Sequence, residues 1–346
     1  MLTISVVIPT RNRHSSLLRT LRSLDKQIFP LREIIIVDSS DEPLNMAELE
    51  GMQCKDLIRY IQSEPSVCIQ RNIGIKLAES DYVFLCDDDI EVEPDYLKNL
   101  ANFIETKFSE TKIEVGAVTG SFLQKENDGT WKATYDVNRF VSLLFVFIFQ
   151  LSIWGRIDRI KTNIITLPMC KLIWKFYQRR GNRNTLAGWP LITQIGDIYR
   201  TKVYTLGGCL VKRTWLLDSP YDEILDPNGL GDNFGVAVDF PQDQAIHVLR
   251  DQSIYHHRSP ENRLKASVSY MRRVLALHYF LHQKKQFGVS HRLWFMWSLL
   301  GNLCLQIILR NRDMVRATFH AIKLILMGRN PYILARNRGS KIVIPN

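Results

Sequence analysis

The chain has little of what a disulfide-bonded or zinc-clamped protein needs. Its 346 residues include six cysteines, and no two of them stand at CxxC spacing or pair with a histidine at zinc-finger spacing. We therefore expect reduced, buried thiols rather than a disulfide framework or a structural zinc site. The first residues also lack the basic and apolar segments of a signal peptide, which favours a cytoplasmic protein.

Acidic residues are scarce in two segments. Residues 263–346 hold fifteen Lys and Arg against one acid, and residues 139–202 hold eleven against two. Because the net charge of the whole chain is only +10, the remainder is acidic. This asymmetry indicates a polyanionic partner, either an anionic membrane or a nucleic acid. No zinc-finger, RRM or helix-turn-helix pattern is present, so we expect no nucleic-acid partner.

The chain also lacks an apolar run of the about 20 residues that a membrane-spanning helix needs. Its longest uncharged runs are 140–155 and 293–309, and both carry polar interruptions, flanking arginines and tryptophan. This pattern favours amphipathic helices that lie on an anionic surface. We therefore expect peripheral association with the inner face of the cell membrane. A true span, and packing within the protein, stay open as alternatives.

The N-terminal third does contain a regular alternation of β-branched runs and helical patterns. The expected strands cover 4–8, 33–37, 59–61 and 82–86. The expected helices cover about 15–24, 68–78 and 94–108. Further on, strand character returns at 207–211, 245–249 and 253–255, a short helix is expected at 232–240, and the chain reads as helical from about 264. The alternation predicts an α/β fold with a doubly wound, mostly parallel sheet, whose ligands bind at the carboxyl ends of the strands.

Three adjacent aspartates, Asp87, Asp88 and Asp89, follow one of these strands. Like charges repel, and carboxylates beside a buried strand lose hydration, so a divalent cation would offset both costs. In extended backbone the side chains of Asp87 and Asp89 point the same way and can face one ion. Oxygen ligands suit Mn²⁺ or Mg²⁺, which would neutralise a departing nucleoside diphosphate. A solvated turn is the alternative reading.

Four segments together resemble family 2 glycosyltransferases of the GT-A fold: ISVVIPTRNR, IIIVDSSD, QRNIGIKLAESDYVFLCDDDIEVEPDYL and YDEILDPNGLGDN. The resemblance covers about residues 3–118 and resumes near 206–257. It implies a metal-dependent, inverting enzyme that moves a sugar from a nucleoside-diphosphate sugar, by expectation a UDP-sugar, to a hydroxyl. The acceptor would be a saccharide or lipid-linked acceptor in surface polysaccharide or glycolipid assembly. The implied GT-A fold is Rossmann-like, with a basic amphipathic insertion and a helical C-terminal region.

The resemblance also implies roles for single residues. The nucleotide-sugar ligands would be Pro9, Thr10, Arg11, Asp38, Arg71, Asp87 and Asp88. The metal ligands would be Asp89, Asp87 and His257, with His256 as the alternative histidine. Asp232 would be the catalytic base, and it could also cap a helix. The family commonly places Glu-Asp there, where this chain has Gly231 and Asp232.

We expect four segments from these patterns. They are a nucleotide-sugar-binding half at 1–118, an insertion that associates with membranes at 119–205, an acceptor-side half with the base at 206–262, and a basic helical region at 263–346. Two alternatives stay open. One is a transferase that acts directly on polyprenyl phosphate. The other is a catalytically inactive, membrane-bound nucleotide-sugar-binding scaffold, which the glycine at position 231 keeps possible.

Overall fold

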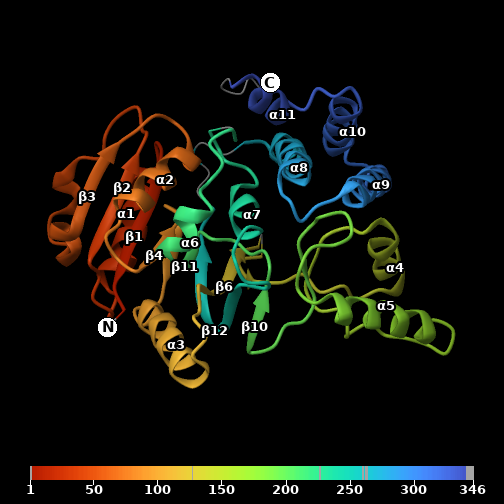
Figure 1. Cartoon of the computed structure of the whole chain (residues 1–346), viewed down its shortest axis with the longest axis horizontal. Coiled ribbons are helices and arrows are strands. Elements are labelled where there is room, and N and C mark those ends of the chain that lie inside the picture. Colours follow the sequence, from red (N-terminus) through yellow and green to blue (C-terminus); the bar gives the residue numbers. More distant parts are fainter. Residues whose placement is uncertain (1, 127, 226, 259–260, 262–263, 340–346) are drawn as a thin grey trace.

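The computed structural model describes residues 2–126, 128–225, 227–258, 261 and 264–339 (Figure 1). The strands are β1 (Ile4–Thr10), β2 (Glu33–Asp38), β3 (Ile58–Gln62), β4 (Tyr82–Cys86), β5 (Ile90–Val92), β6 (Ala117–Lys125), β7 (Trp131–Lys132), β8 (Ile153–Trp154), β9 (Leu191–Ile192), β10 (Ile198–Thr201), β11 (Gly208–Lys212) and β12 (Ile246–His256). The α-helices are α1 (His14–Asp25), α2 (Val67–Leu77), α3 (Tyr96–Thr111), α4 (Phe140–Phe149), α5 (Leu167–Arg180), α6 (Arg213–Asp218), α7 (Asp232–Ala237), α8 (Ala266–Gln283), α9 (Val289–Ile308), α10 (Arg312–Leu326) and α11 (Pro331–Arg338). Two short 3₁₀ turns lie at Met46–Leu49 and Gln53–Leu57.

The elements predicted for the N-terminal third are confirmed. Their burial explains them, because β1, β2 and β4 are buried almost throughout and consist largely of β-branched or aromatic residues. The helix α2 begins where the Ser66 hydroxyl accepts the backbone N–H of Ile69. The two strands expected at 245–249 and 253–255 form one strand, β12, with an irregularity between Leu249 and Ser253.

The main sheet has the strand order β10-β12-β6-β11-β4-β1-β2-β3, with β5 paired to β12 and β7 to β6. The pairs β1–β2, β1–β4, β2–β3 and β6–β12 are parallel, and β11 runs antiparallel between β4 and β6. The chain leaves β1 through α1 to β2 on one side, and it reaches β4 on the other side of β1 through α2. The strand order therefore reverses between β1 and β4, where open α/β sheets bind their ligands.

The expected insertion is a separate layer with a small core of its own. Its buried residues are Leu143, Ile153, Ile157, Ile160, Cys170, Ile173, Tyr177 and Leu191. They come from α4, α5, the two-stranded pair β8–β9 and the loop between β8 and α5. Its limits differ from the expected 119–205, because β6 and β10 are strands of the main sheet. The inserted part lies between them, in the chartreuse segment of Figure 1.

The first uncharged run is not one continuous helix. The helix α4 ends at Phe149, Gln150 adopts a left-handed φ of 50°, and β8 follows. The second run lies within α9, and the two runs contact each other. The Phe149 ring stacks on Trp297 with 5.0 Å between ring centres, and the Trp297 indole N–H donates to the carbonyl of Ile148 over 2.9 Å. Part of each run is thus packed within the protein. In the described part of the chain, no helix combines the length and apolar character needed to cross a membrane.

The helical C-terminal region is confirmed as α8 to α11, of which α8 lies beside α7 (Figure 1). Its expected range runs to residue 346, and residues 340–346 lie outside the described residues. Five of the six cysteines are buried, as expected, whereas Cys304 on α9 is exposed. The packing of α8 on α7 is close, because a Cβ at Gly235 would lie 2.4 Å from the ring of Phe280. This contact holds α8 over one wall of the site described next.

Candidate active site

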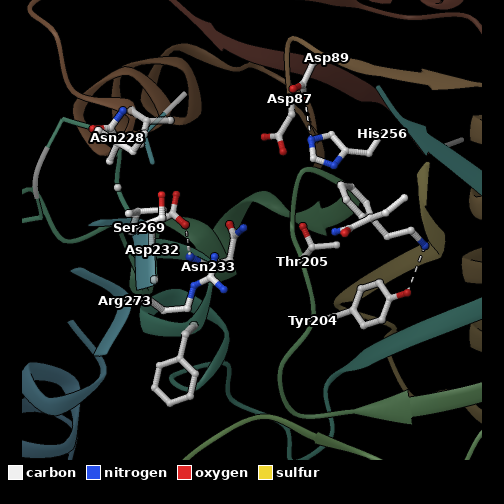
Figure 2. Close-up of a pocket in the computed structure, with 18 of the residues that line it drawn as sticks. Asp87, Asp89, Tyr204, Thr205, Asn228, Asp232, Asn233, His256, Ser269 and Arg273 are labelled. Atoms are coloured by element: carbon white, nitrogen blue, oxygen red, sulfur yellow. Dashed lines mark hydrogen bonds and ion pairs between the residues drawn. The ribbon is translucent and has the colours of Figure 1, made fainter. Parts of the chain in front are cut away.

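A cleft with a volume of about 1250 Å³ opens at the carboxyl ends of β1 and β4. Pro9, Thr10 and Arg11 line it from the end of β1, and the three aspartates line it from the end of β4. The end of β12, the loop before α7, and α8 supply other parts of the wall, together with β6, the inserted part and residues 203–205. Figure 2 shows Asp87, Asp89 and His256 at one end of this cleft. The convergence predicted from the strand ends is therefore present for these residues.

Asp88 joins the two central strands. Its carboxylate accepts the Thr10 hydroxyl over 2.8 Å and the Arg13 guanidinium over 3.0 Å. Burial raises the pKa of this carboxyl to about 6, against the opposing effect of the Arg13 charge and with a contribution from Asp89. Asp88 thus fixes the relative position of β1 and β4 at the point where the strand order reverses.

Arg71 connects the two sides of the cleft. It extends from α2, donates to Asp87 over 2.6 Å and forms an ion pair with Asp232. Its guanidinium also lies 5.0 Å from the centre of the Tyr221 ring. Burial lowers the pKa of Arg71, but the charge of Asp232, with Asp87 contributing, outweighs it and raises the pKa overall. One buried cation therefore joins an acid at the end of β4 to the acid predicted as the base.

Asp232 is the first residue of α7, and Gly231 rather than Asp232 occupies the capping position. Gly231 has a φ of 96°, and a Cβ there would lie 3.2 Å from the Cβ of Ala276 on α8. A glutamate at 231 would be strained in this backbone, which explains the glycine in physical terms. The backbone N–H of Asn233 donates to Asp232 over 2.6 Å and helps to fix its carboxylate.

The two adjacent histidines at the end of β12 point to different partners. Nε2 of His256 lies 3.2 Å from Oδ1 of Asp89 and lines the cleft. The imidazole of His257 instead contacts Glu91 over 2.9 Å, and the backbone N–H of His257 donates to the backbone carbonyl of Asp89. The geometry therefore favours the alternative histidine, His256, as the residue beside the acidic cluster.

The pair Asp89 and His256 fits a divalent cation. Two ligands about 2.1 Å from one octahedral ion and at right angles to each other lie about 3 Å apart, which matches the observed separation of their donor atoms. Among the described residues, no group of three His, Cys, Asp or Glu side chains is placed to hold a metal. Asp87, the other predicted ligand, is paired with Arg71.

Asp38 lies behind the cleft rather than in its lining. The carboxylate is buried at the end of β2, where it accepts the backbone N–H of Ser40 over 2.7 Å and the hydroxyl of Tyr60. The structure thus places Asp38 next to the loop after β1 without exposing it to the space that a nucleotide would occupy.

Several residues of the cleft had no assigned role in the sequence reasoning. Arg13 stands in the TRNR run and could have been found there, since it faces Asp88. Arg273 lines the cleft from a helix far along the chain, and no local pattern marks it. Tyr221 lies against Arg71 and is buried rather than part of the lining, and it is the first residue of the YDEILDPNGLGDN segment.

Comparison with known proteins agrees with this geometry. Residues 5–140 match the family model described as glycosyl transferase family 2. The chain is 32% identical over 103 residues to the uncharacterized glycosyltransferase YwdF of Bacillus subtilis, a match that covers 30% of this chain and 38% of YwdF. It is 30% identical over 118 residues to the poly(ribitol-phosphate) β-N-acetylglucosaminyltransferase TarS of Staphylococcus aureus, covering 33% of this chain and 21% of TarS. Both matches thus span less than two fifths of the relative's length.

A solved structure shows a likeness over almost the whole chain. Residues 1–349 of S. aureus TarS in complex with UDP-GlcNAc align with a TM-score of 0.52 at 14% identity, covering 98% of this chain and 93% of that one. This likeness confirms the predicted GT-A fold. The similarity to the family 2 glycosyltransferase model is thus confined to residues 5–140, whereas the likeness in fold extends over almost the whole chain.

Proposed function

We propose that the chain is a metal-dependent, inverting glycosyltransferase of cell-surface polysaccharide or glycolipid assembly. It would transfer a sugar from a UDP-sugar to a hydroxyl of a lipid-linked saccharide. The observation that carries this proposal is the link from Asp87 through Arg71 to Asp232, which joins a strand-end acidic cluster to a second carboxylate in one cleft. The UDP-GlcNAc complex of the structural neighbour and the polymer named in the TarS relative support the donor and the setting.

The donor half would lie between the ends of β1 and β4. Arg11 lines this part of the cleft, and Arg13 faces Asp88 and Asp89 there. Asp89 and His256 would hold Mn²⁺ or Mg²⁺. When bound, this ion supplies charge neutralisation for the leaving nucleoside diphosphate. Arg71 would place a second positive charge near the same diphosphate.

Asp232 would act as the base. The acceptor oxygen attacks the anomeric carbon, the bond from that carbon to the phosphate oxygen breaks, and UDP leaves. The hydroxyl proton passes to the carboxylate of Asp232. A single displacement of this kind inverts the anomeric configuration. The ion pair with Arg71 and the N–H of Asn233 orient the carboxylate toward the cleft.

The acceptor would reach the cleft from an anionic membrane. The outward side of α9 carries exposed apolar residues at helical spacing, namely Leu293, Trp297, Leu300, Ile307 and Ile308. The exposed side of α10 mixes cations with apolar residues, namely Arg312, Arg316, Phe319, Lys323 and Leu326. Apolar side chains beside cations are complementary to the acyl boundary and the charged headgroups of an anionic bilayer. Met314 lines the cleft from the opposite, inward side of α10, so this helix lies between the exposed face and the site.

Donor turnover tests the enzymatic part of the proposal. We expect wild-type protein to release UDP from one UDP-sugar with Mn²⁺ and membrane extract, and to stop when a chelator is added. Asp232→Asn should lose at least a hundredfold in transfer but keep its affinity for UDP. Unchanged transfer in this variant would contradict the assignment of the base. UDP binding without turnover of any donor by the wild type would instead support a nucleotide-sugar-binding scaffold.

Vesicle co-sedimentation tests the membrane part. The double variant Leu300→Glu and Ile308→Glu should lose binding to vesicles that contain anionic lipid, because it places two charges in the apolar face. Ile28→Glu is the control, since the exposed fraction of Ile28, 61%, lies between those of Leu300 and Ile308. Ile28 belongs to the turn between α1 and β2, and these two elements lie far from α9 (Figure 1). Equal binding of both variants, or no preference for anionic over neutral vesicles, would contradict the membrane face.

A further inference from the structure

One cation of the cleft has no counter-ion in the described residues. Arg273 extends from α8, is exposed to the cleft and lines it. No carboxylate of the described chain lies within ion-pair distance of its guanidinium, although Asp232 is near enough to influence it. The crowded surroundings lower the pKa of Arg273, and the charge of Asp232 opposes this shift. The guanidinium stays protonated, since arginine titrates far above neutral pH.

Two neutral donors accompany this cation. Ser269 precedes Arg273 by one helical turn on α8, and its hydroxyl has no hydrogen bond among the described residues. Asn233 receives the Tyr221 hydroxyl on its amide oxygen over 3.3 Å, and its NH₂ group donates to no described residue. In Figure 2 the side chains of Ser269, Asn233 and Arg273 lie around Asp232.

The position of this group separates it from the donor half. In Figure 2, Asp87, Asp89 and His256 lie on one side of Asp232, and Arg273 lies on the other. The electrostatic effects agree with this arrangement. The charge of Asp232 raises the pKa of Arg273, whereas the charges of Asp87, Asp88 and Asp89 raise the pKa of Arg13. A ligand at Arg273 would therefore meet the base from the acceptor side.

We propose that Arg273, Ser269 and Asn233 bind a phosphate group of the acceptor, next to the hydroxyl that Asp232 deprotonates. A guanidinium pairs with phosphate in a bidentate manner, and hydroxyl and amide donors complete the binding of a tetrahedral anion. The inference rests on the proposed function, since it assigns the substrate class of the same site. The phosphate belongs either to the diphosphate of a lipid carrier or to a phosphodiester within a polymer.

Calorimetric titration with methyl phosphate, in the presence of saturating UDP and Mn²⁺, tests the site. We expect wild-type protein to bind the probe, Arg273→Gln to bind it at least tenfold more weakly, and Arg273→Lys to fall between them. The Kd of UDP should stay within twofold in all three proteins, which also shows that the variants fold. Arg22→Gln is the control, because Arg22 is an exposed arginine on α1 outside the cleft lining.

Three outcomes would overturn the inference. They are no binding of methyl phosphate by the wild type, equal affinity in Arg273→Gln, or a loss of UDP affinity that matches the loss of phosphate affinity, which would assign Arg273 to the donor. A wild-type protein that does not bind UDP would refute the proposed function alone, since the titration without UDP still measures the phosphate site.

Transfer assays then separate the two sources of phosphate. The KM of Arg273→Gln should rise at least tenfold for the acceptor class that supplies the phosphate, with a smaller change in kcat. The two acceptors to compare are a polyprenyl-diphosphate-linked saccharide and a water-soluble polyol phosphodiester oligomer. An unchanged KM for both would again overturn the assignment.

Discussion

The substitution Arg71→Met tests whether Arg71 stabilises the fold through its ion pairs with Asp87 and Asp232. The arginine side chain is 7% exposed, and those of Asp232 and Asp87 are 11% and 25% exposed. Methionine keeps much of the length and apolar volume of the arginine stem but removes the charge. Asp232 would then be a carboxylate that has lost its ion-pair partner in a nearly buried position.

Breaking a buried ion pair by removing one partner costs about 3–5 kcal/mol, because the remaining charge is uncompensated. We therefore expect Arg71→Met to lower the free energy of unfolding by about this amount, as measured by urea denaturation at neutral pH without added metal. The loss of the cation–π contact with the Tyr221 ring lowers the free energy of unfolding further. The double variant Arg71→Met with Asp232→Asn should regain part of the loss, since it also removes the negative charge of Asp232.

Arg32→Met is the matched control. Arg32 pairs with Glu79 over 3.2 Å, but both side chains are more than half exposed. An exposed pair contributes at most about 1 kcal/mol. If Arg71→Met destabilises the protein no more than this control does, or if the double variant is worse than the single one, the idea that Arg71 neutralises a buried carboxylate is refuted.

Three further changes test separate features. Burial first, and then nearby His282 and Arg292, lower the pKa of His278 to about 3, so the stability that its neutral form contributes above pH 6.5 falls as the pH drops toward 3. Between pH 7.5 and pH 5 the free energy of unfolding of the wild type should therefore fall by about 2 kcal/mol more than that of His278→Gln. An equal fall in the two proteins, measured by urea denaturation, would contradict this. Gly231→Ala should destabilise by about 1–2 kcal/mol because of its left-handed backbone, and an unchanged urea midpoint would remove the physical reason for glycine there. His256→Ala should raise the Mn²⁺ concentration needed for UDP binding at least tenfold, whereas His257→Ala should change it less than threefold, and the reverse order would restore His257 as the ligand.

The N-terminal third could be predicted closely because its signals are local. Buried parallel strands read as short β-branched runs, and each of them ends at polar residues that the strand direction carries to one edge. Thr10 and Asp88 illustrate the point, since they are far apart in sequence and hydrogen-bonded in the fold. Knowing that the two strands were parallel and that polar residues followed them was enough to bring these residues together.

The rest depends on packing that no single segment encodes. His256 and His257 are adjacent, and which one faces Asp89 follows from the irregularity in β12, which resets the alternation of its side chains. Arg273 reaches the cleft because α8 packs on α7, where Gly235 and Phe234 of α7 contact Phe280 of α8. Most of strand β6 falls in the range expected for the insertion, but β6 belongs to the main sheet. The sequence did not show this, because its parallel partner β12 lies far beyond it in the chain.

The apolar run of α9 shows why the sequence could not predict which of its residues pack within the protein and which face outward. A helix that is apolar on all sides is usually buried on all sides. Here Phe295, Ser298 and Leu299 face the protein and are fully buried, while Trp297 is shared between Phe149 and solvent, and Leu300 is exposed. The same composition therefore serves an internal contact on one side and an outward face on the other. An amphipathic pattern is a difference in polarity between two sides of a helix. Because both sides of α9 are apolar, the sequence shows little such difference, and only the fold shows which residues are buried and which are exposed. The exposed apolar residues of α9 therefore form a surface distinct from the internal contact, and its partner can be tested separately.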